Sequence, residues 1–263
     1  MNLAPLAANL RVISALSARS IKQAFRRPQF LAPVLIFPSL FLAVNTGGAG
    51  PAVEIPGFPE VHGFLDFQLA GSMMQATMLA GVSGGIALAL DIEMGFIDRL
   101  FAAPIARSAM VLGRLAATGL LGLLAGVWFL GIGLIFGARI EAGVPGVLLI
   151  LVLATLAATA FGGIGAALAL RAGRASVVQG IFPLVFVILF LSSAFFPGEL
   201  LLEPARSIST WNPLSFIADG LRQPVISAIS LNEVGKCLGG IAIVGGAGWL
   251  LSAAALRARL KAA

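Results

Sequence analysis

Long apolar stretches alternate with short charged ones along almost the whole chain. Six windows of at least 20 residues contain no Asp, Glu, Lys or Arg, namely 28–53, 67–90, 115–138, 142–170, 175–198 and 237–256. A helix of about 20 apolar residues, at 1.5 Å per residue, spans a hydrocarbon core of about 30 Å. The windows are continuously apolar and do not alternate, which favours helices over the strands of a membrane barrel.

The pattern therefore predicts an all-α membrane protein with six transmembrane helices. We expect the spans at about 28–47, 67–90, 115–137, 145–170, 177–197 and 236–256. The composition agrees, because 59% of the 263 residues are hydrophobic and only 11% are charged. Such a balance is foreign to a water-soluble domain of this size.

The basic residues indicate how the chain is oriented, since cytoplasmic loops retain Lys and Arg. Four of the 17 lie on one predicted side of the membrane: Arg139, Arg206, Arg222 and Lys236. The other 13 belong to the two ends and to the alternate loops. Both termini are thus predicted to be cytoplasmic. The net charge of +6 reflects this topology and contact with anionic membrane lipid, and we expect no nucleic-acid partner.

Two regions outside the windows carry further structure. Residues 9–26 place apolar and basic side chains on opposite helical arcs, which predicts an amphipathic helix lying at the membrane interface. A solvated cytoplasmic tail is the alternative. Residues 197–234 form the longest outer connection and are too apolar for a free loop. We expect short helices there that dip into the outer interface.

A compact charged segment, residues 91–115, separates the second and third windows. Gly95 can break a helix and Pro104 can end one, and the residues between them alternate apolar and charged positions at helical spacing. A short cytoplasmic helix with an apolar ridge and flanking charges suits docking into a groove of a partner protein. The alternative is an inner loop that folds over and holds two helices together.

The second window contains a polar stripe. Gln68, Ser72, Gln75 and Ser83 fall within about 80° of arc on a helical wheel. Such a stripe should avoid lipid. It either bonds to another helix or lines a path for something passing through the membrane.

The chain offers little chemistry of its own. None of the apolar windows contains a charged residue, so the ionisable relay of an ion-coupled carrier is missing. The single histidine, His62, provides neither a catalytic triad nor a metal site, and Cys237 has no second cysteine to pair with. The nearest approach to a phosphate-binding loop is at Lys236, where Ser230 replaces the first glycine and Cys237 replaces the hydroxyl residue. Energy for transport would therefore come from a partner chain.

Two groups of residues resemble motifs of a known family. The first is Asp91, Glu93, Gly95, Asp98-Arg99-Leu100, Pro104, Arg107 and Gly113-Arg114. The second is Phe195-Phe196-Pro197, Trp211-Asn212-Pro213-Leu214 and Asp219-Gly220-Leu221-Arg222. Together they resemble the membrane-spanning subunits of type-two ABC (ABC-2) exporters, the branch that includes bacterial daunorubicin-resistance permeases. The resemblance covers nearly the whole chain and implies that residues 1–263 form a single transmembrane domain.

The resemblance implies an assembly as well as a fold. Two copies of an ABC ATP-binding protein would hold ATP and magnesium, and a second permease subunit, identical or different, would complete the transporter in a bacterial cell membrane. The coupling helix that contacts the ATPase would include Asp91, Glu93, Gly95, Phe96, Arg99, Leu100, Pro104 and Arg107. The exit side would be shaped by Pro197, Asn212, Pro213, Asp219 and Arg222. The chain itself would be no enzyme and would bind no cofactor directly.

The expected activity is export of a hydrophobic or amphipathic compound, drug-like or lipid-like, as in antibiotic resistance. Export of a polysaccharide or glycolipid is an alternative, because relatives of this architecture carry those. A rival of another class is a membrane scaffold that binds a partner through the same loop. An intramembrane enzyme is disfavoured, because no paired acids, metal ligands or activated nucleophile fall inside the windows.

Overall fold

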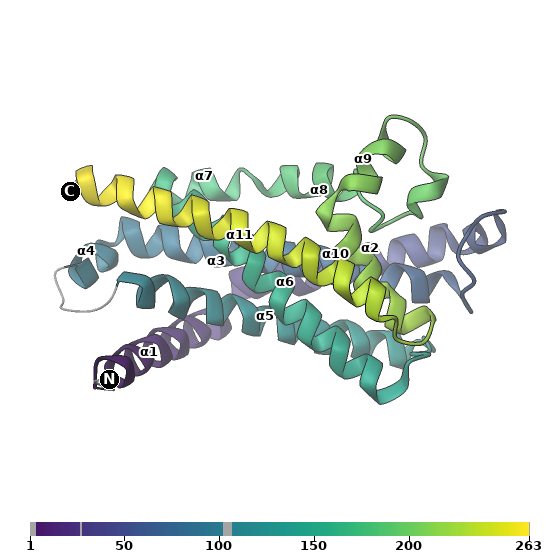
Figure 1. The fold of residues 1–263 in the computed structure, drawn as a ribbon, viewed down its shortest axis with the longest axis horizontal. Helices are drawn as coiled ribbons and strands as arrows, with labels where there is room; N and C mark the ends of the chain where they lie inside the picture. The colour runs from purple at the N-terminus through teal and green to yellow at the C-terminus, as the bar shows by residue number, and fades with distance from the viewer. Residues whose placement is uncertain (1–3, 27, 102–106, 263) are drawn as a thin grey trace.

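The protein is a bundle of long helices that run nearly parallel to one another, and a computed structural model describes residues 4–26, 28–101 and 107–262 (Figure 1). Within these residues every regular element is helical and no strand occurs. The all-α fold predicted from the apolar windows is therefore confirmed.

Among the residues that the structure describes, five helices are long and apolar enough to cross a membrane. They are α2 (Pro28–Gly48), α3 (Phe64–Glu93), α5 (Arg107–Ile135), α6 (Gly143–Ala172) and α11 (Leu231–Ala262). Each covers one of the predicted windows, because a continuous run of apolar residues buries its backbone polar groups best as a helix. The multi-pass character of the chain is established by these five.

The remaining predicted span, 177–197, is not one continuous helix. It is divided into α7 (Ala175–Gln179) and α8 (Phe182–Phe190), and the chain turns away after Phe190. Gly180 ends α7 and Pro183 stands in the first turn of α8, where its missing N–H costs nothing. The predicted count of six spanning helices is therefore not confirmed by helix length and hydropathy.

Helix α3 is the centre of the bundle and is buried along most of its length. It packs against α6 through glycines, since a Cβ at Gly85 would lie only 2.6 Å from the Gly165 carbonyl oxygen. On another side, Gly84 lies against Thr118 of α5. These close approaches show that small residues of α3 allow the backbones to meet.

Helix α1 (Ala4–Arg26) covers the predicted amphipathic segment and packs on α5. Between α8 and α11 lie a 3-10 turn at Gly198–Leu200, α9 (Ala205–Trp211) and α10 (Pro213–Ile226). A short 3-10 turn also occupies Gly50–Glu54, before α3. Short helices are thus present where the sequence predicts them, and their placement at a membrane interface stays a prediction.

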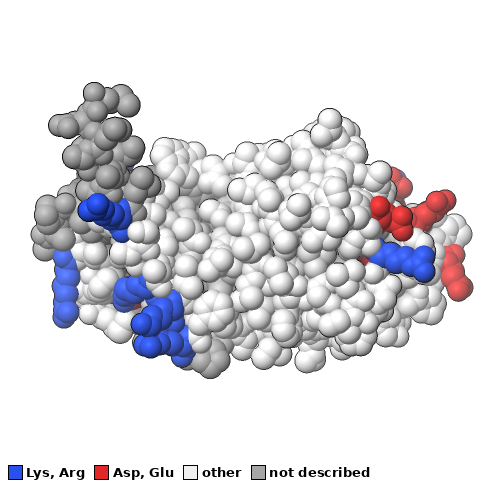
Figure 2. All heavy atoms as spheres, turned by 90° about the horizontal axis from the view of Figure 1, so that it is seen from below, with Lys and Arg blue, Asp and Glu red and all other residues white. Residues whose placement is uncertain are grey.

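The two ends of the bundle differ in charge. Both termini and α4 (Phe96–Phe101) lie at one end, and α9 lies toward the other (Figure 1). Figure 2 shows Lys and Arg gathered at the first end and most of the visible Asp and Glu at the opposite end. The first end is the one that the basic residues predict to be cytoplasmic.

Candidate functional site

A buried carboxylate lies at the end of the bundle that carries α4, on the last turn of α3. Asp91 is fully buried and accepts two hydrogen bonds from Arg19 of α1, each 3.0 Å long. Arg114 of α5 donates to the same carboxylate. This arginine triad (Arg19, Asp91 and Arg114) joins α1 and α5 to α3, and bidentate geometry makes the Arg19 contact specific in direction.

The triad also touches the short helix that follows. Gly95, with φ of +65°, breaks the chain between α3 and α4, in a conformation that favours glycine. The centre of the Phe96 ring of α4 lies 3.8 Å from the Cζ atom of Arg19, so α4 contacts the same cluster. Glu93 is exposed and accepts a 2.9 Å hydrogen bond from the Ala175 backbone N–H, which joins α3 to the start of α7.

The predicted coupling residues thus divide into two sets. Asp91 is buried among helices and Phe96 is half-buried, whereas Glu93 and Arg99 are exposed at this end of the molecule and Leu100 is partly buried. Pro104 lies outside the described residues, and so does the side chain of Arg107, whose backbone opens α5. From the sequence, Asp91 was predicted to belong to a surface contact with the ATPase. Its pairing with Arg19 and Arg114 was not predicted.

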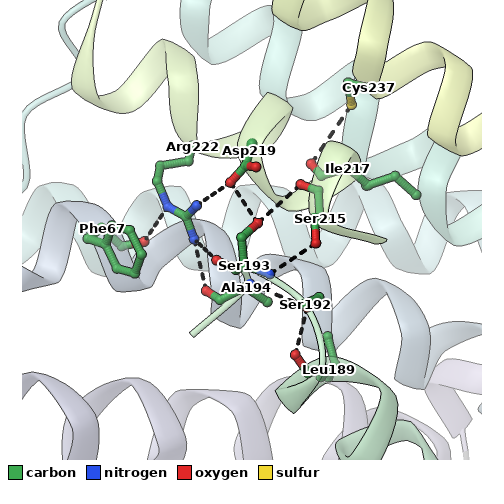
Figure 3. A network of polar contacts seen from close by, with 10 residues as sticks. All are labelled: Phe67, Leu189, Ser192, Ser193, Ala194, Ser215, Ile217, Asp219, Arg222 and Cys237. Carbon is green, nitrogen blue, oxygen red and sulfur yellow. Dashed lines mark hydrogen bonds and ion pairs between the residues drawn. The ribbon is translucent and has the colours of Figure 1, made fainter. Parts of the chain in front are cut away.

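At the opposite end a second polar cluster surrounds Arg222 of α10 (Figure 3). This guanidinium donates to the carbonyl oxygens of Phe67, Ser193 and Ala194, at 3.3, 2.8 and 2.9 Å. It also pairs with Asp219 at 2.5 Å and lies 3.8 Å from the centre of the Phe67 ring. Asp219 in turn accepts a 2.8 Å hydrogen bond from the Ser193 hydroxyl.

This outer cage (Ser193, Asp219 and Arg222) joins three parts of the chain. The carbonyls that Arg222 contacts belong to Phe67 of α3 and to Ser193 and Ala194 in the turn after α8. Burial raises the pKa of the Asp219 carboxyl, and the positive charge of Arg222 and the Ser193 hydroxyl oppose that rise.

The other predicted outer residues support the same turn. Asn212 accepts a 3.0 Å hydrogen bond from the Leu214 backbone N–H, as an N-cap of α10, and its amide nitrogen donates to the Leu191 carbonyl. Pro213 occupies the first position of α10, and Pro197 is buried where the 3-10 turn begins. The structure therefore brings all five of these residues into one region.

An open cavity of about 660 Å³ lies beside the outer cage. Its lining combines hydroxyl and charged side chains, among them Ser193, Glu199, Arg206, Asp219 and Arg222. A smaller cavity of about 300 Å³ lies deeper, between α3, α6, α8 and α11, and is lined almost wholly by apolar side chains such as Met78, Phe161 and Leu184. The first cavity has a mixed polar and apolar lining, and the second suits an apolar group.

The polar stripe of α3 is completely enclosed. Gln68, Ser72 and Gln75 have no exposed surface, and none of their side-chain polar atoms has a hydrogen-bond partner. Ser83 is also buried, and it lines a narrow cleft beside Arg114 and Thr118. An unpaired buried polar group costs about 1–3 kcal/mol. The sequence predicted the burial of this stripe, and nothing in the sequence indicated that its first three members would lack partners.

Several long apolar helices, with positive charge gathered at one end and polar clusters at both ends, are the features of a multi-pass membrane protein. The chain belongs to the ABC-2 type transporter family, whose model matches residues 11–226. The match includes the arginine triad, α4 and the outer cage. The resemblance drawn from the two motifs is thus confirmed.

A named relative agrees with this assignment. The daunorubicin resistance ABC transporter permease protein DrrB1 of Streptomyces coeruleorubidus is 27% identical over 212 residues, which cover 80% of this chain and 74% of the relative. The relative is named as a permease of a drug-resistance transporter.

Proposed function

We propose that this chain is the permease subunit of an ATP-driven exporter. Two copies of a separate ATP-binding protein would hold ATP and magnesium, and a second permease subunit, identical or different, would complete the route through the membrane. The cargo is a hydrophobic or amphipathic compound, drug-like or lipid-like, taken from the cytoplasm or the inner leaflet. The name of the drug-resistance relative supports this cargo class.

The arrangement around α4 is the observation that carries the proposal. Arg99 is exposed on α4, and α4 follows α3 after a single break at Gly95. The arginine triad joins the end of α3 to α1 and α5. A push on α4 by a closing pair of ATPases would therefore reach three helices at once, and the bundle would tilt as a unit.

Reversing the charge of Arg99 tests this contact. We expect Arg99→Glu to weaken recovery of the ATPase by about ten-fold or more, because a lost charge contact of ~1.4 kcal/mol is a factor of ten in affinity. ATP-driven export should fall in parallel, while membrane insertion and thermal stability stay unchanged. The measurement is co-purification from the native membrane, with export assayed in the same cells.

Arg139→Glu is the matched control, since Arg139 is an exposed arginine near the opposite end of the bundle. It should leave ATPase recovery and export at the level of the unchanged protein. If Arg99→Glu retained full ATPase recovery and full export, the assignment of α4 to the coupling contact would be wrong.

We also propose that residues 175–194 cross the membrane as a sixth, interrupted span. One end of this segment is fixed beside Glu93, through the Ala175 N–H. The other end lies beside Gly71, where an added Cβ would come within 3.0 Å of the Ala194 carbonyl carbon. Between these two points α3 rises by about 33 Å, at 1.5 Å per residue, which matches a hydrocarbon core of about 30 Å.

Labelling from the two sides of the membrane tests the sixth span. In a Cys237→Ala background, cysteines introduced as Arg174→Cys and Glu199→Cys occupy exposed positions on either side of the segment. We expect a membrane-impermeant maleimide to reach position 199 from outside intact cells and position 174 only after the cells are opened. Labelling of both positions from the same side would contradict the sixth crossing.

A further inference from the structure

We infer that Gln68, Ser72 and Gln75 form a polar strip that contacts the cargo, and that it recognises uncharged hydrogen-bonding groups such as hydroxyl, carbonyl or ether oxygens. The strip is closed in this structure and becomes accessible when α2 separates from α3. This inference rests on the proposed export function, and it adds to that function a contact surface and a chemical class of cargo.

The first step is the direction in which the strip faces. At 100° per residue, the centre of the strip lies about 130° around α3 from Gly81 and Gly85, which pack against α6. Two other sides of α3 are also occupied, by α5 at Gly84 and by the turn after α8 at Gly71. The remaining long helix packed on α3 is α2, so the strip faces the seam between α2 and α3.

The second step is the unsatisfied state of the strip. Five side-chain polar atoms are buried without a partner: Nε2 and Oε1 of Gln68, Oγ of Ser72, and Nε2 and Oε1 of Gln75. A second permease subunit cannot supply the missing bonds while the seam is closed, because one chain alone already encloses all three side chains. Buried polar groups are normally paired, so the strip is expected to find its partners in another state of the protein.

The third step is the ease with which α2 can move away. Much less of α2 than of α3 is buried, so α2 is held by one face only. Pro33 and Pro38 lie inside it, and each removes a helix hydrogen bond and invites a bend. Pro38 is itself buried, and its missing N–H leaves the Val34 carbonyl without its usual helix partner. Opening at this seam therefore disrupts fewer contacts than opening between α3 and α6.

The chemical class follows from the strip and its surroundings. The strip offers amide and hydroxyl groups and no charge, and α2 contributes apolar side chains such as Val34 and Leu42 to the same core. An ion would lose its hydration shell there without gaining a counter-charge. A neutral amphipathic molecule gains hydrogen bonds on one side and apolar contact on the other.

The first test compares thermal unfolding of the purified permease with export by the same variants, and the unfolding measurement needs no ATPase. We expect Gln68→Leu and Gln75→Leu each to raise the thermal unfolding temperature in detergent by about 2–4 °C, because each removes unpaired polar atoms and keeps a similar volume. The same variants should lose most of their ATP-driven export. Thr77→Val is the matched control, since Thr77 is equally buried on the far side of α3 and its hydroxyl is already bonded to the Met74 carbonyl; it should not gain stability. If the two leucine variants were less stable than the unchanged protein, the strip would serve helix packing and the inference would be wrong.

The second test follows the seam in the complex with the ATPase. In the Cys237→Ala background, a thiol introduced by Ser72→Cys should react with a small maleimide only when ATP and vanadate are present, because the reaction needs water and an ionised thiol. The thiol of Thr77→Cys should stay unreactive in both conditions. An unreactive position 72 in both conditions would contradict the opening of the seam.

The same labelled position tests the cargo class. Tetraethylene glycol monooctyl ether, which is uncharged, should protect position 72 from the maleimide, and octyltrimethylammonium, a cation with the same tail, should not. If both compounds protected position 72 equally, or if only the cation protected it, the inferred chemical class of the cargo would be wrong. The unfolding measurement requires no ATPase, so a failure of this inference is distinguishable from a failure of the proposed function.

Discussion

Asp91→Asn is expected to destabilise the protein by about 3–5 kcal/mol, the usual cost of removing one partner from a buried ion pair. The Asp91 side chain has no exposed surface, and Arg114 is only 8% exposed, so the change leaves a positive charge buried without its counter-charge. At about 2–4 °C per kcal/mol for a chain of this size, the unfolding temperature should fall by roughly 6–20 °C. The measurement is thermal unfolding of the detergent-purified protein, followed by its monodisperse fraction.

Glu93→Gln is the matched control for this experiment. Glu93 stands two residues further along the same turn but is exposed, and a glutamine oxygen can still accept the Ala175 hydrogen bond. Its effect on unfolding should be small. If Asp91→Asn does not fold, Asp91→Asn combined with Arg114→Met should recover part of the stability, because the uncompensated charge is then removed as well. An Asp91→Asn protein as stable as the unchanged one would contradict a holding role for the triad.

Arg222→Met is expected to cost about 3 kcal/mol or more. The change removes a buried charge partner from Asp219 and leaves the carbonyls of Phe67, Ser193 and Ala194 without their donor. Methionine keeps the apolar stem of the side chain, so most of the loss comes from the guanidinium contacts. The turn after α8 should loosen first, and thermal unfolding together with protease sensitivity between residues 191 and 212 reports both effects.

Arg206→Met provides the comparison for Arg222. Arg206 lies beside the same cavity but is exposed, and exposed charges contribute at most about 1 kcal/mol. Its unfolding temperature should stay close to that of the unchanged protein. Equal losses in the two variants would show that the outer cage does not hold the turn.

The apolar pattern was sufficient to predict the long helices, since 20 or more uncharged residues leave the backbone few other ways to satisfy its polar groups. The same pattern failed for residues 177–197. Hydropathy is uniform there, whereas Gly180 and Pro183 divide the segment into α7 and α8. Gly180 and Pro183 are both signals of a helix break. The prediction missed the break because it used only the absence of charged residues, and the window is uncharged throughout.

The polar clusters could be predicted only in part. An acidic residue at the end of a predicted span was visible as Asp91, but its burial was not, because its partners come from 72 and 23 residues away in the chain. The cage around Arg222 likewise uses Phe67, which is 155 residues distant. Such pairs depend on how the helices pack against one another. The periodicity within one segment carries no information about that packing.

The coupling assignment shows the same division between local and long-range information. Gly95 and the short helix after it were evident in the sequence, because a helix break and its spacing are local features. The sequence grouped Asp91 with the exposed residues of that segment. In the structure Asp91 is instead buried between two arginines, which join the end of α3 to α1 and α5.

The most direct test of the central claim is recovery of the tagged protein from its native membrane in mild detergent, with mass spectrometry of everything that accompanies it. An ATP-driven permease should bring with it a soluble protein that carries Walker A and Walker B motifs, in a ratio near one ATPase per permease. Recovery of the intact permease without any such ATPase, under conditions where known transporter complexes survive, would contradict the account and favour a membrane scaffold.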